Sequence, residues 1–130
     1  MVPCTTLEGL VVHERLNLGF IKMDVEGAEA EVLSTAWSVF ERFWPTLISE
    51  FSPCLLERSG ADPQVLLRAL RNLGYRLIDP IMPKIAVGQR EFGDLLAVPE
   101  EKYSTGELME TVWEAHAKAK HHRNQKGDKG

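Results

Sequence analysis

Apolar and polar residues follow one another along the chain in blocks that predict strands and helices in turn. The first clear block is Phe20–Val25, which reads FIKMDV and is bounded by Gly19 and Gly27. Short and mostly apolar runs between glycines are typical of strands. The apolar residues do not alternate cleanly with polar ones, which favours a central strand that is covered on both faces. Lys22 is the exception to this pattern.

A helix is predicted directly after this strand, over Ala28–Phe43. Its apolar residues recur at spacings of three and four, which places them on one face. Pro45 ends it, because proline cannot continue a helix. A second helix has stronger end signals: Asp62 suits the N-cap, Pro63 the first helical position, and Gly74 the position just past the end.

Three further strands and a final helix complete the pattern. Strand–helix–strand units imply parallel strands joined by right-handed crossovers. The last two strands have no helix between them, so we expect them to pair antiparallel. The sequence therefore predicts an α/β fold. The additional strands are Thr46–Phe51, Tyr75–Asp79 and Asp94–Val98, and the final helix, at 104–120, opens with a capping box of Ser104 and Glu107.

Composition and charge narrow the class of protein. The length of 130 residues fits one modest domain, and the net charge of −4 argues against a nucleic-acid partner. No apolar run approaches the roughly 20 residues that a membrane helix needs, and the first residues lack the pattern of a signal peptide. Cys4 and Cys54 match no metal-binding spacing. Reduced thiols in a cytoplasmic protein are the simplest interpretation.

Positive charge gathers at the C-terminal end. Between Lys118 and Gly130, five Lys or Arg residues and one Asp give a net charge of +4. This segment has almost no apolar content, which is typical of disorder. We therefore predict a disordered basic tail at 121–130. The simplest interpretation of its charge is that the tail is a solvated chain end without a binding role.

The candidate chemistry lies where the first strand ends. In open α/β sheets, ligands bind beyond the carboxyl ends of the strands, and Asp24 and Glu26 lie there. Gly27 allows a tight turn into the helix. Such carboxylates can accept hydrogen bonds from a ligand, hold a metal ion or act as a base. An acid that ends an apolar strand is costly without a partner, which favours a functional role for Asp24; Lys22 is a candidate partner.

Other acids have a simpler explanation or a weaker signal. Glu29 and Glu31 fall in the first turn of the predicted helix, where negative charge complements the helix dipole. Glu50 ends the next strand, and it rims the same crevice as Asp24 if the two strands are neighbours. A carboxylate module that binds a metal ion remains an alternative, although no ligand spacing supports it.

Several of these stretches together resemble a known family. The sequence FIKMDVEGAEAEVL followed by FWPTLISEFSP is similar to the signature of the FkbM family of methyltransferases, which use S-adenosylmethionine. TTLEGLV upstream, and GYRLID and DLLAVP downstream, fall where that family has related segments. The resemblance covers roughly residues 2–99, and its DVEGAE core is the most specific part.

The resemblance implies a Rossmann-like class I methyltransferase sheet that closes with an antiparallel strand pair. It implies methyl transfer to a hydroxyl group of a sugar, a polyketide or another small molecule. Asp24 and Glu26 would be catalytic, Asp24 and Gly27 would contact the cofactor, and Glu50 would contact the acceptor.

The chain departs from the family in one respect. No glycine-rich loop that could grip the cofactor is found upstream of Phe20. We therefore expect residues 1–103 to form the C-terminal portion of a methyltransferase domain, which by itself is inactive and binds the cofactor weakly. The alternative is a non-catalytic α/β remnant that binds a partner. The strand at 20–25 would then present a bare edge, and we expect self-association through it.

Overall fold

The computed structural model describes residues 3–103, and the chain divides into two compact units between Pro99 and Glu100. The first unit holds four strands and five helices among its described residues. The strands are β1 (Phe20–Met23), β2 (Thr46–Phe51), β3 (Tyr75–Ile78) and β4 (Gly93–Pro99). The helices are α1 (Leu7–His13), α2 (Glu29–Ser34), α3 (Trp37–Phe43), α4 (Pro53–Arg58) and α5 (Pro63–Asn72).

The four strands form one mixed sheet in the order β1-β2-β4-β3. β1 and β2 are parallel, with Phe20 opposite Thr46 and Met23 opposite Ser49. β4 is antiparallel to both of its neighbours, β2 and β3. The α/β class, the parallel first pair and the antiparallel closing pair that the sequence predicted are thus confirmed.

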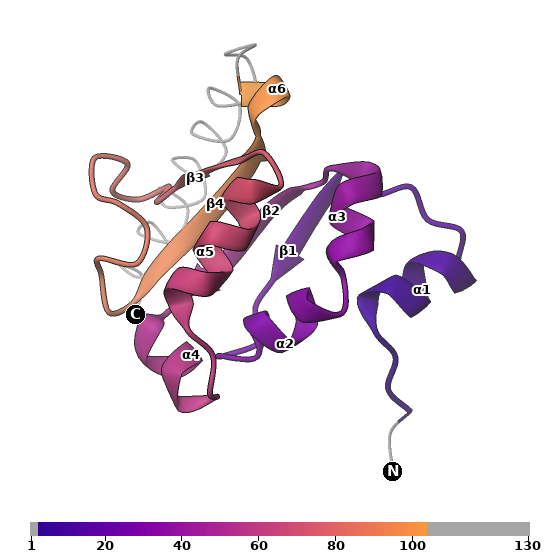
Figure 1. The fold of residues 1–130 in the computed structure, drawn as a ribbon, viewed down its shortest axis with the longest axis horizontal. Coiled ribbons are helices and arrows are strands. Elements are labelled where there is room, and N and C mark those ends of the chain that lie inside the picture. The colour runs from indigo at the N-terminus through magenta and orange to yellow at the C-terminus, as the bar shows by residue number, and fades with distance from the viewer. Residues whose placement is uncertain (1–2, 104–130) are drawn as a thin grey trace, which may run out of the picture. The chain divides into compact units, whose positions relative to one another are not determined.

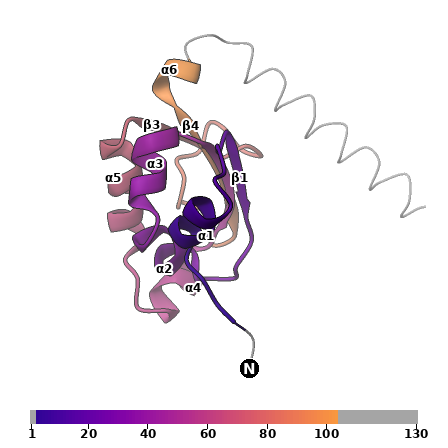
Figure 2. The same cartoon turned by 90° about the vertical axis from the view of Figure 1, so that its right-hand side faces the viewer.

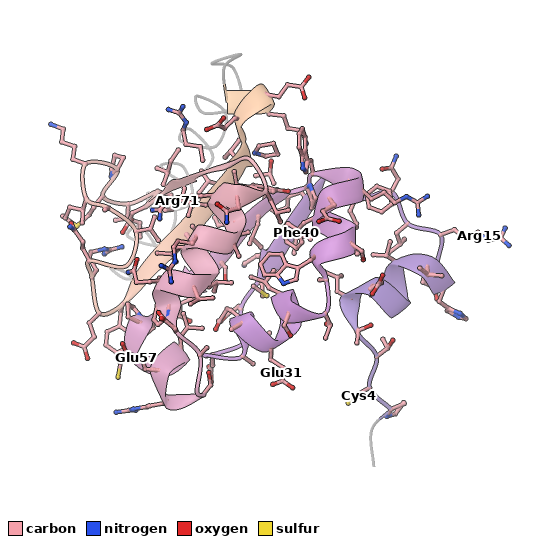
Figure 3. The ribbon with its side chains drawn as sticks, viewed as in Figure 1. Cys4, Arg15, Glu31, Phe40, Glu57 and Arg71 are labelled. Atoms are coloured by element: carbon pink, nitrogen blue, oxygen red, sulfur yellow. The ribbon has the colours of Figure 1, made fainter. Side chains whose placement is uncertain are left out.

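Helices α2, α3 and α5 lie on one side of the sheet, in front of it in Figure 1, and the turned view in Figure 2 places α3 and α5 on that same side. The core fills the space between the two layers. Phe40 from α3 (Figure 3) is fully buried there. Its ring lies edge-on to that of Tyr75, with the centroids 5.9 Å apart. The other buried core residues include Met23, Leu33, Ala36, Leu47, Phe51, Leu67, Leu70 and Leu95.

The first strand differs from its prediction. It ends at Met23, and it lies at an edge of the sheet among the described residues. Met23 faces the core, whereas Phe20 is 55% exposed and Lys22 is also exposed. The expectation that both faces of this strand are covered was therefore wrong: only the face toward the helices is buried.

The helix predicted over Ala28–Phe43 is two helices. Helix α2 ends at Ser34, α3 begins at Trp37, and Ala36 between them has φ −124°. The hydroxyl groups of Ser34 and Thr35 donate to the carbonyl oxygens of Glu31 and Val32, at 2.7 and 3.1 Å. Such local side-chain hydrogen bonds compete with helical ones and explain the break.

The cap that was predicted at Asp62 is confirmed, and other helices also begin at a capping side chain. Asp62 accepts from the backbone N–H of Gln64 at 2.8 Å, with Pro63 at the first position of α5. Thr6 accepts from the N–H of Gly9 at the start of α1. Helix α4 was not predicted, although Ser52 and Pro53 repeat the cap signature of α5.

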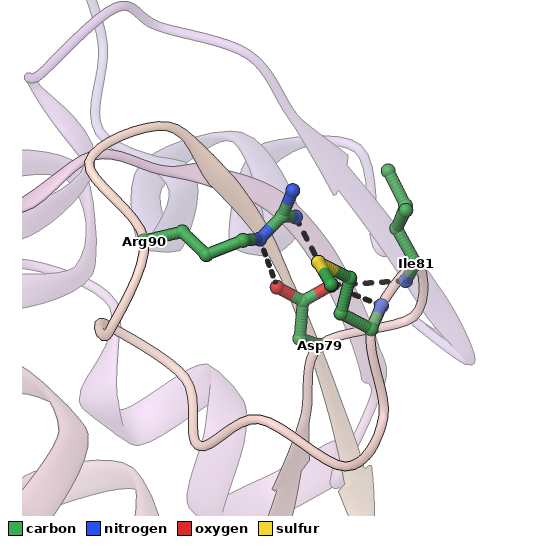
Figure 4. A network of polar contacts seen from close by, with 4 residues as sticks. Asp79, Ile81 and Arg90 are labelled. Atoms are coloured by element: carbon green, nitrogen blue, oxygen red, sulfur yellow. Dashed lines mark hydrogen bonds and ion pairs between the residues drawn. The ribbon is translucent and has the colours of Figure 1, made fainter.

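An ion pair between a buried carboxylate and a partly exposed arginine orders the long connection between β3 and β4. The carboxylate of Asp79 accepts from Arg90 Nε at 2.8 Å and from Arg90 Nη2 at 3.1 Å (Figure 4). It also accepts from the N–H groups of Ile81 and Met82, at 2.9 and 3.0 Å. Burial alone would raise the pKa of Asp79, but these hydrogen bonds outweigh it and leave the pKa below its ordinary value.

The second unit begins with helix α6 (Glu100–Tyr103). The predicted helix at 104–120 and the predicted tail at 121–130 lie outside the described residues. Within the described part of the chain, no helix has both the length and the apolar character needed to cross a membrane.

Candidate functional site

A tight turn carries the chain from β1 into α2. The N–H of Ala28 donates to the carbonyl of Val25 at 3.2 Å, and the two central residues, Glu26 and Gly27, have φ of 50° and 100°. Positive φ at both central positions is the pattern of a type I′ turn. Glu26 therefore holds a left-handed conformation, which is uncommon for a residue other than glycine and occurs more often at functional sites.

Gly27 is required by its neighbour across the turn. A Cβ atom at this position would lie 3.1 Å from both Cβ and the carbonyl oxygen of Leu55 in α4. Gly27 is buried, so its lack of a side chain serves the close approach of the turn to α4.

The two acids around this turn are exposed. Asp24 follows directly after Met23 at the carboxyl end of β1, and Glu26 follows two residues later. Because Asp24 is exposed, the cost of burial, on which its functional assignment was based, does not apply. No ion pair joins Asp24 to Lys22, both of which the structure describes. A functional role for Asp24 is therefore supported only by its place at the carboxyl end of β1.

Glu50 lies within electrostatic reach of several carboxylates. It lies on β2, half-buried and directly opposite Asp94 on β4. Burial raises its pKa above the ordinary value, and the negative charges of Asp24, Glu29, Asp94 and Glu26 raise it further. Asp24 and Glu50 thus lie close enough to interact electrostatically, as the hypothesis of a shared crevice requires.

Glu29 is the residue that the sequence interpretation missed. It is 4% exposed, whereas the other acid in the first turn of α2, Glu31, is exposed. A signal was present: Glu29 stands four residues before Leu33 and seven before Ala36, both of which are buried. An acid on the apolar stripe of a helix is buried with that stripe.

A surface pocket of about 520 Å³ opens beside the turn. Glu26 and Glu31 contribute its carboxylates, and Figure 3 shows Glu31 projecting from α2 into solvent. The rest of the lining is small: Gly27, Ala28, Ala30, Ser59, Gly60 and Ala61. Its volume falls within the roughly 300–1,000 Å³ of small-molecule sites.

The carboxylates are not arranged as a metal centre. Within residues 3–103, no group of three or more His, Cys, Asp or Glu side chains is placed to hold a metal ion. The arrangement can instead accept hydrogen bonds and attract a positively charged group.

Comparison with protein-family models found one that covers this region. The model described as the methyltransferase FkbM domain matches residues 1–77, which include β1, the turn at Glu26, and β2. Searches of curated proteins and of solved structures found no match. Since the family model covers more than half of the chain, the chain belongs to the FkbM methyltransferase family.

Proposed function

We propose that the chain is part of an S-adenosylmethionine-dependent O-methyltransferase that acts on a hydroxyl group of a sugar, a polyketide or another small molecule. The family supports methyl transfer. The mixed sheet, with its parallel pair β1–β2 and its antiparallel closing pair, supports a Rossmann-like class I arrangement. The location in the cytoplasm stays a prediction.

The position of Glu26 carries the proposal. Its carboxylate lines the pocket, and its charge also acts on Glu50, so Glu26 links the pocket to the carboxylates at the ends of β1 and β2. The left-handed backbone at Glu26 fixes the turn that brings this about. A small molecule in the pocket would therefore meet the acidic residues Glu26 and Glu31.

The chain's own carboxylates suit the acceptor side of such a reaction. Asp24 or Glu26 would accept a hydrogen bond from the acceptor hydroxyl, orient its oxygen and take up its proton. Glu50 would hold a second donor group of the acceptor. S-adenosylmethionine, when bound, supplies the methyl group.

The described residues fit only part of that cofactor. S-adenosylmethionine carries positive charge, and Asp24 and Glu26 are exposed acids without an ion-pair partner among the described residues. Upstream of β1, however, the described glycines do not form a cradle. A Cβ atom at Gly9 would lie 2.7 Å from the hydroxyl oxygen of Thr5 inside a helix cap, and Gly19 faces open space. We propose that Asp24 and the Gly27 turn contact the methionine end of the cofactor, with weak affinity.

Calorimetry tests this proposal. S-adenosylmethionine titrated into the 130-residue chain should bind weakly, and Asp24→Asn and Glu26→Gln should each weaken binding about tenfold, as expected for the loss of one charge-assisted hydrogen bond. Glu41→Gln, which removes an exposed acid from α3, is the matched control and should change nothing. Tight binding would overturn the expectation of a partial site, and binding that neither site variant changes would overturn the assignment of the site.

An alternative is a non-catalytic, partner-binding domain. The observation that favours it is the edge position of β1 with Phe20 55% exposed, because an unpaired apolar strand edge is a template for another strand. A second copy of this chain is the partner that we propose.

A further inference from the structure

The connection between β3 and β4 is long, and its two ends meet. Residues 80–92, which we call the β3–β4 loop, form no helix or strand. Asp79 directly before the loop accepts hydrogen bonds from Arg90 near its end, at 2.8 and 3.1 Å (Figure 4). A compact surface loop whose ends lie close together is an Ω-loop, and such loops are frequently functional.

The β3–β4 loop is fastened at its own base. Besides the pair with Arg90, the carboxylate of Asp79 accepts from the N–H groups of Ile81 and Met82. All of these hydrogen bonds lie at the base of the loop, and none of them reaches a helix. Gly93 leaves room for this arrangement, because a Cβ atom there would lie 3.4 Å from both the carboxylate and the guanidinium group.

One side chain anchors the middle of the loop in the core. Val87 is 7% exposed and belongs to the cluster of buried core residues. The next residue, Gly88, passes close to β2 and α5: a Cβ atom on it would lie 3.3 Å from the ring of Phe51 and 3.6 Å from Leu67. The loop therefore covers the last residue of β2.

The backbone of the loop is not tied to the sheet or to the helices. Its hydrogen bonds are local, from the N–H of Ile85 to the carbonyl of Met82 at 2.9 Å and from the N–H of Gln89 to the carbonyl of Ala86 at 3.2 Å. Among the described residues, no backbone hydrogen bond joins 81–91 to another element. A segment with so few external contacts opens at a free energy below that of global unfolding.

We propose that the β3–β4 loop is a latched flap. The ion pair of Asp79 and Arg90 is the latch, and the flap opens as one unit when this pair separates and Val87 leaves the core. Opening uncovers the apolar ring of Phe51 at the carboxyl end of β2.

The flap lies at the end of the sheet where ligands bind in open α/β folds. β1 is parallel to β2, and β4 is antiparallel to both β2 and β3, so β1, β2 and β3 have their carboxyl ends on one side. The flap follows β3 on this side and leads into β4 (Figure 1). Its opening therefore changes access to this end of the sheet. The inference concerns the loop alone and does not rest on methyl transfer.

Amide hydrogen exchange of the 15N-labelled full chain, followed by NMR, tests whether the flap opens as a unit. The N–H groups of Ile81, Met82, Ile85 and Gln89 are hydrogen-bonded in the closed flap, so their exchange reports opening. Their protection factors should agree with one another. They should lie at least about tenfold below those of the β2–β4 ladder, because the flap opens while the sheet stays folded.

Two variants act on different parts of the flap. Arg90→Gln removes the latch and leaves the carboxylate of Asp79 in place, so the two amides bonded to it keep their acceptor. Val87→Ala removes apolar contacts in the core. Each variant should lower the protection of all four flap amides about tenfold and leave the β2–β4 ladder unchanged. Arg68→Gln, which removes an exposed arginine from α5, is the matched control and should change nothing.

The decisive comparison is the effect of Val87→Ala on amides at both ends of the flap. It should lower the protection of Ile81 as much as that of Gln89, and this comparison alone decides the question should Arg90→Gln fail to fold. Variants that affect only the nearest amides would overturn the proposal, because they would show separate local motions. Wild-type flap amides as protected as the ladder, or without protection, would also overturn it: the first result means that the loop opens only with the whole fold, and the second that it is not latched.

Discussion

Glu50 on β2 and Asp94 on β4 lie directly opposite each other, so two carboxylates share one face of an antiparallel strand pair. Like charges at such positions destabilise a sheet. The structure does not offset this pair with an ion-pair partner among the described residues. The arrangement therefore lowers stability at the position where we propose that a ligand binds.

Replacing Glu50 should stabilise the fold. Glu50→Gln keeps the shape of the side chain and removes the repulsion, so we expect the free energy of unfolding at neutral pH to rise by roughly 0.5–1 kcal/mol. Urea denaturation followed by circular dichroism measures it. Glu41→Gln also removes one negative charge and should change stability by less than about 0.5 kcal/mol.

The gain from Glu50→Gln should depend on pH. The pKa of Glu50 is higher in the folded state than in the unfolded state. The contribution of protonated Glu50 to folding stability is therefore fully present below the unfolded-state pKa, and it is lost as pH rises through the folded-state pKa. The difference between variant and wild type should therefore vanish in acid and grow toward neutral pH. A difference that is constant across this range would contradict the assigned pKa shift.

Asp79 should show the opposite dependence. Asp79→Asn breaks the ion pair of a buried carboxylate with the partly exposed Arg90 and should cost about 2–3 kcal/mol at neutral pH. Since the pKa of Asp79 is lowered in the folded state, this contribution is present above the unfolded pKa and is lost as pH falls through the folded one. Urea denaturation over a pH series measures it. Asp62→Asn is the control, because Asn caps a helix as well as Asp does.

The turn at Gly27 should tolerate no side chain. Gly27→Ala imposes a positive φ on alanine and places Cβ 3.1 Å from Leu55, so we expect a loss of roughly 1–3 kcal/mol in unfolding free energy from crowding alone. Gly60→Ala separates the two effects, because Gly60 also has positive φ but faces open space. A loss in Gly27→Ala no larger than that in Gly60→Ala would show that contact with Leu55 does not matter.

Self-association through β1 should depend on the outward N–H of Lys22. The N–H of Thr46 donates to the carbonyl of Gly19, and Phe20 is opposite Thr46. In a parallel pair this places the backbone groups of Ile21 toward β2 and those of Lys22 toward the open edge. Light scattering should show association of the wild type that increases with concentration.

Proline variants of β1 give the matched comparison. Lys22→Pro removes an N–H that points away from the sheet, so the fold should persist while association is lost. Ile21→Pro removes a hydrogen bond to β2 and should unfold the strand. A wild type that stays monomeric at all concentrations, or Lys22→Pro that associates as strongly as the wild type, would refute the proposed contact.

Local signals in the sequence predicted much of the fold. The bounds of β2 and the caps of α5 were predicted correctly. Both signals are local: β2 is a short apolar run that ends before Ser52, and the cap at Asp62 involves only residues next to it in the sequence. The break between α2 and α3 was not predicted. Leu33, Ala36 and Phe40 keep one buried stripe across it, so the apolar pattern does not reveal the interruption by Ser34 and Thr35.

The sequence indicated which acids lie near one another, but not which acid is buried. Asp24 and Glu26 follow the end of β1, and Glu50 is the last residue but one of the adjacent strand β2. Their proximity depends only on topology. Which acid is buried depends on how α2 packs against distant segments. The sequence interpretation therefore assigned the cost of burial to Asp24, whereas the structure buries Glu29.

Mapping S-adenosylmethionine on the 15N-labelled 130-residue chain by NMR tests the central claim most directly. We expect small shifts that saturate only at high concentration and that are confined to the turn after β1, at residues 24–28. Shifts that cluster on the opposite end of the sheet, or saturable shifts that leave residues 24–28 unchanged, would contradict it.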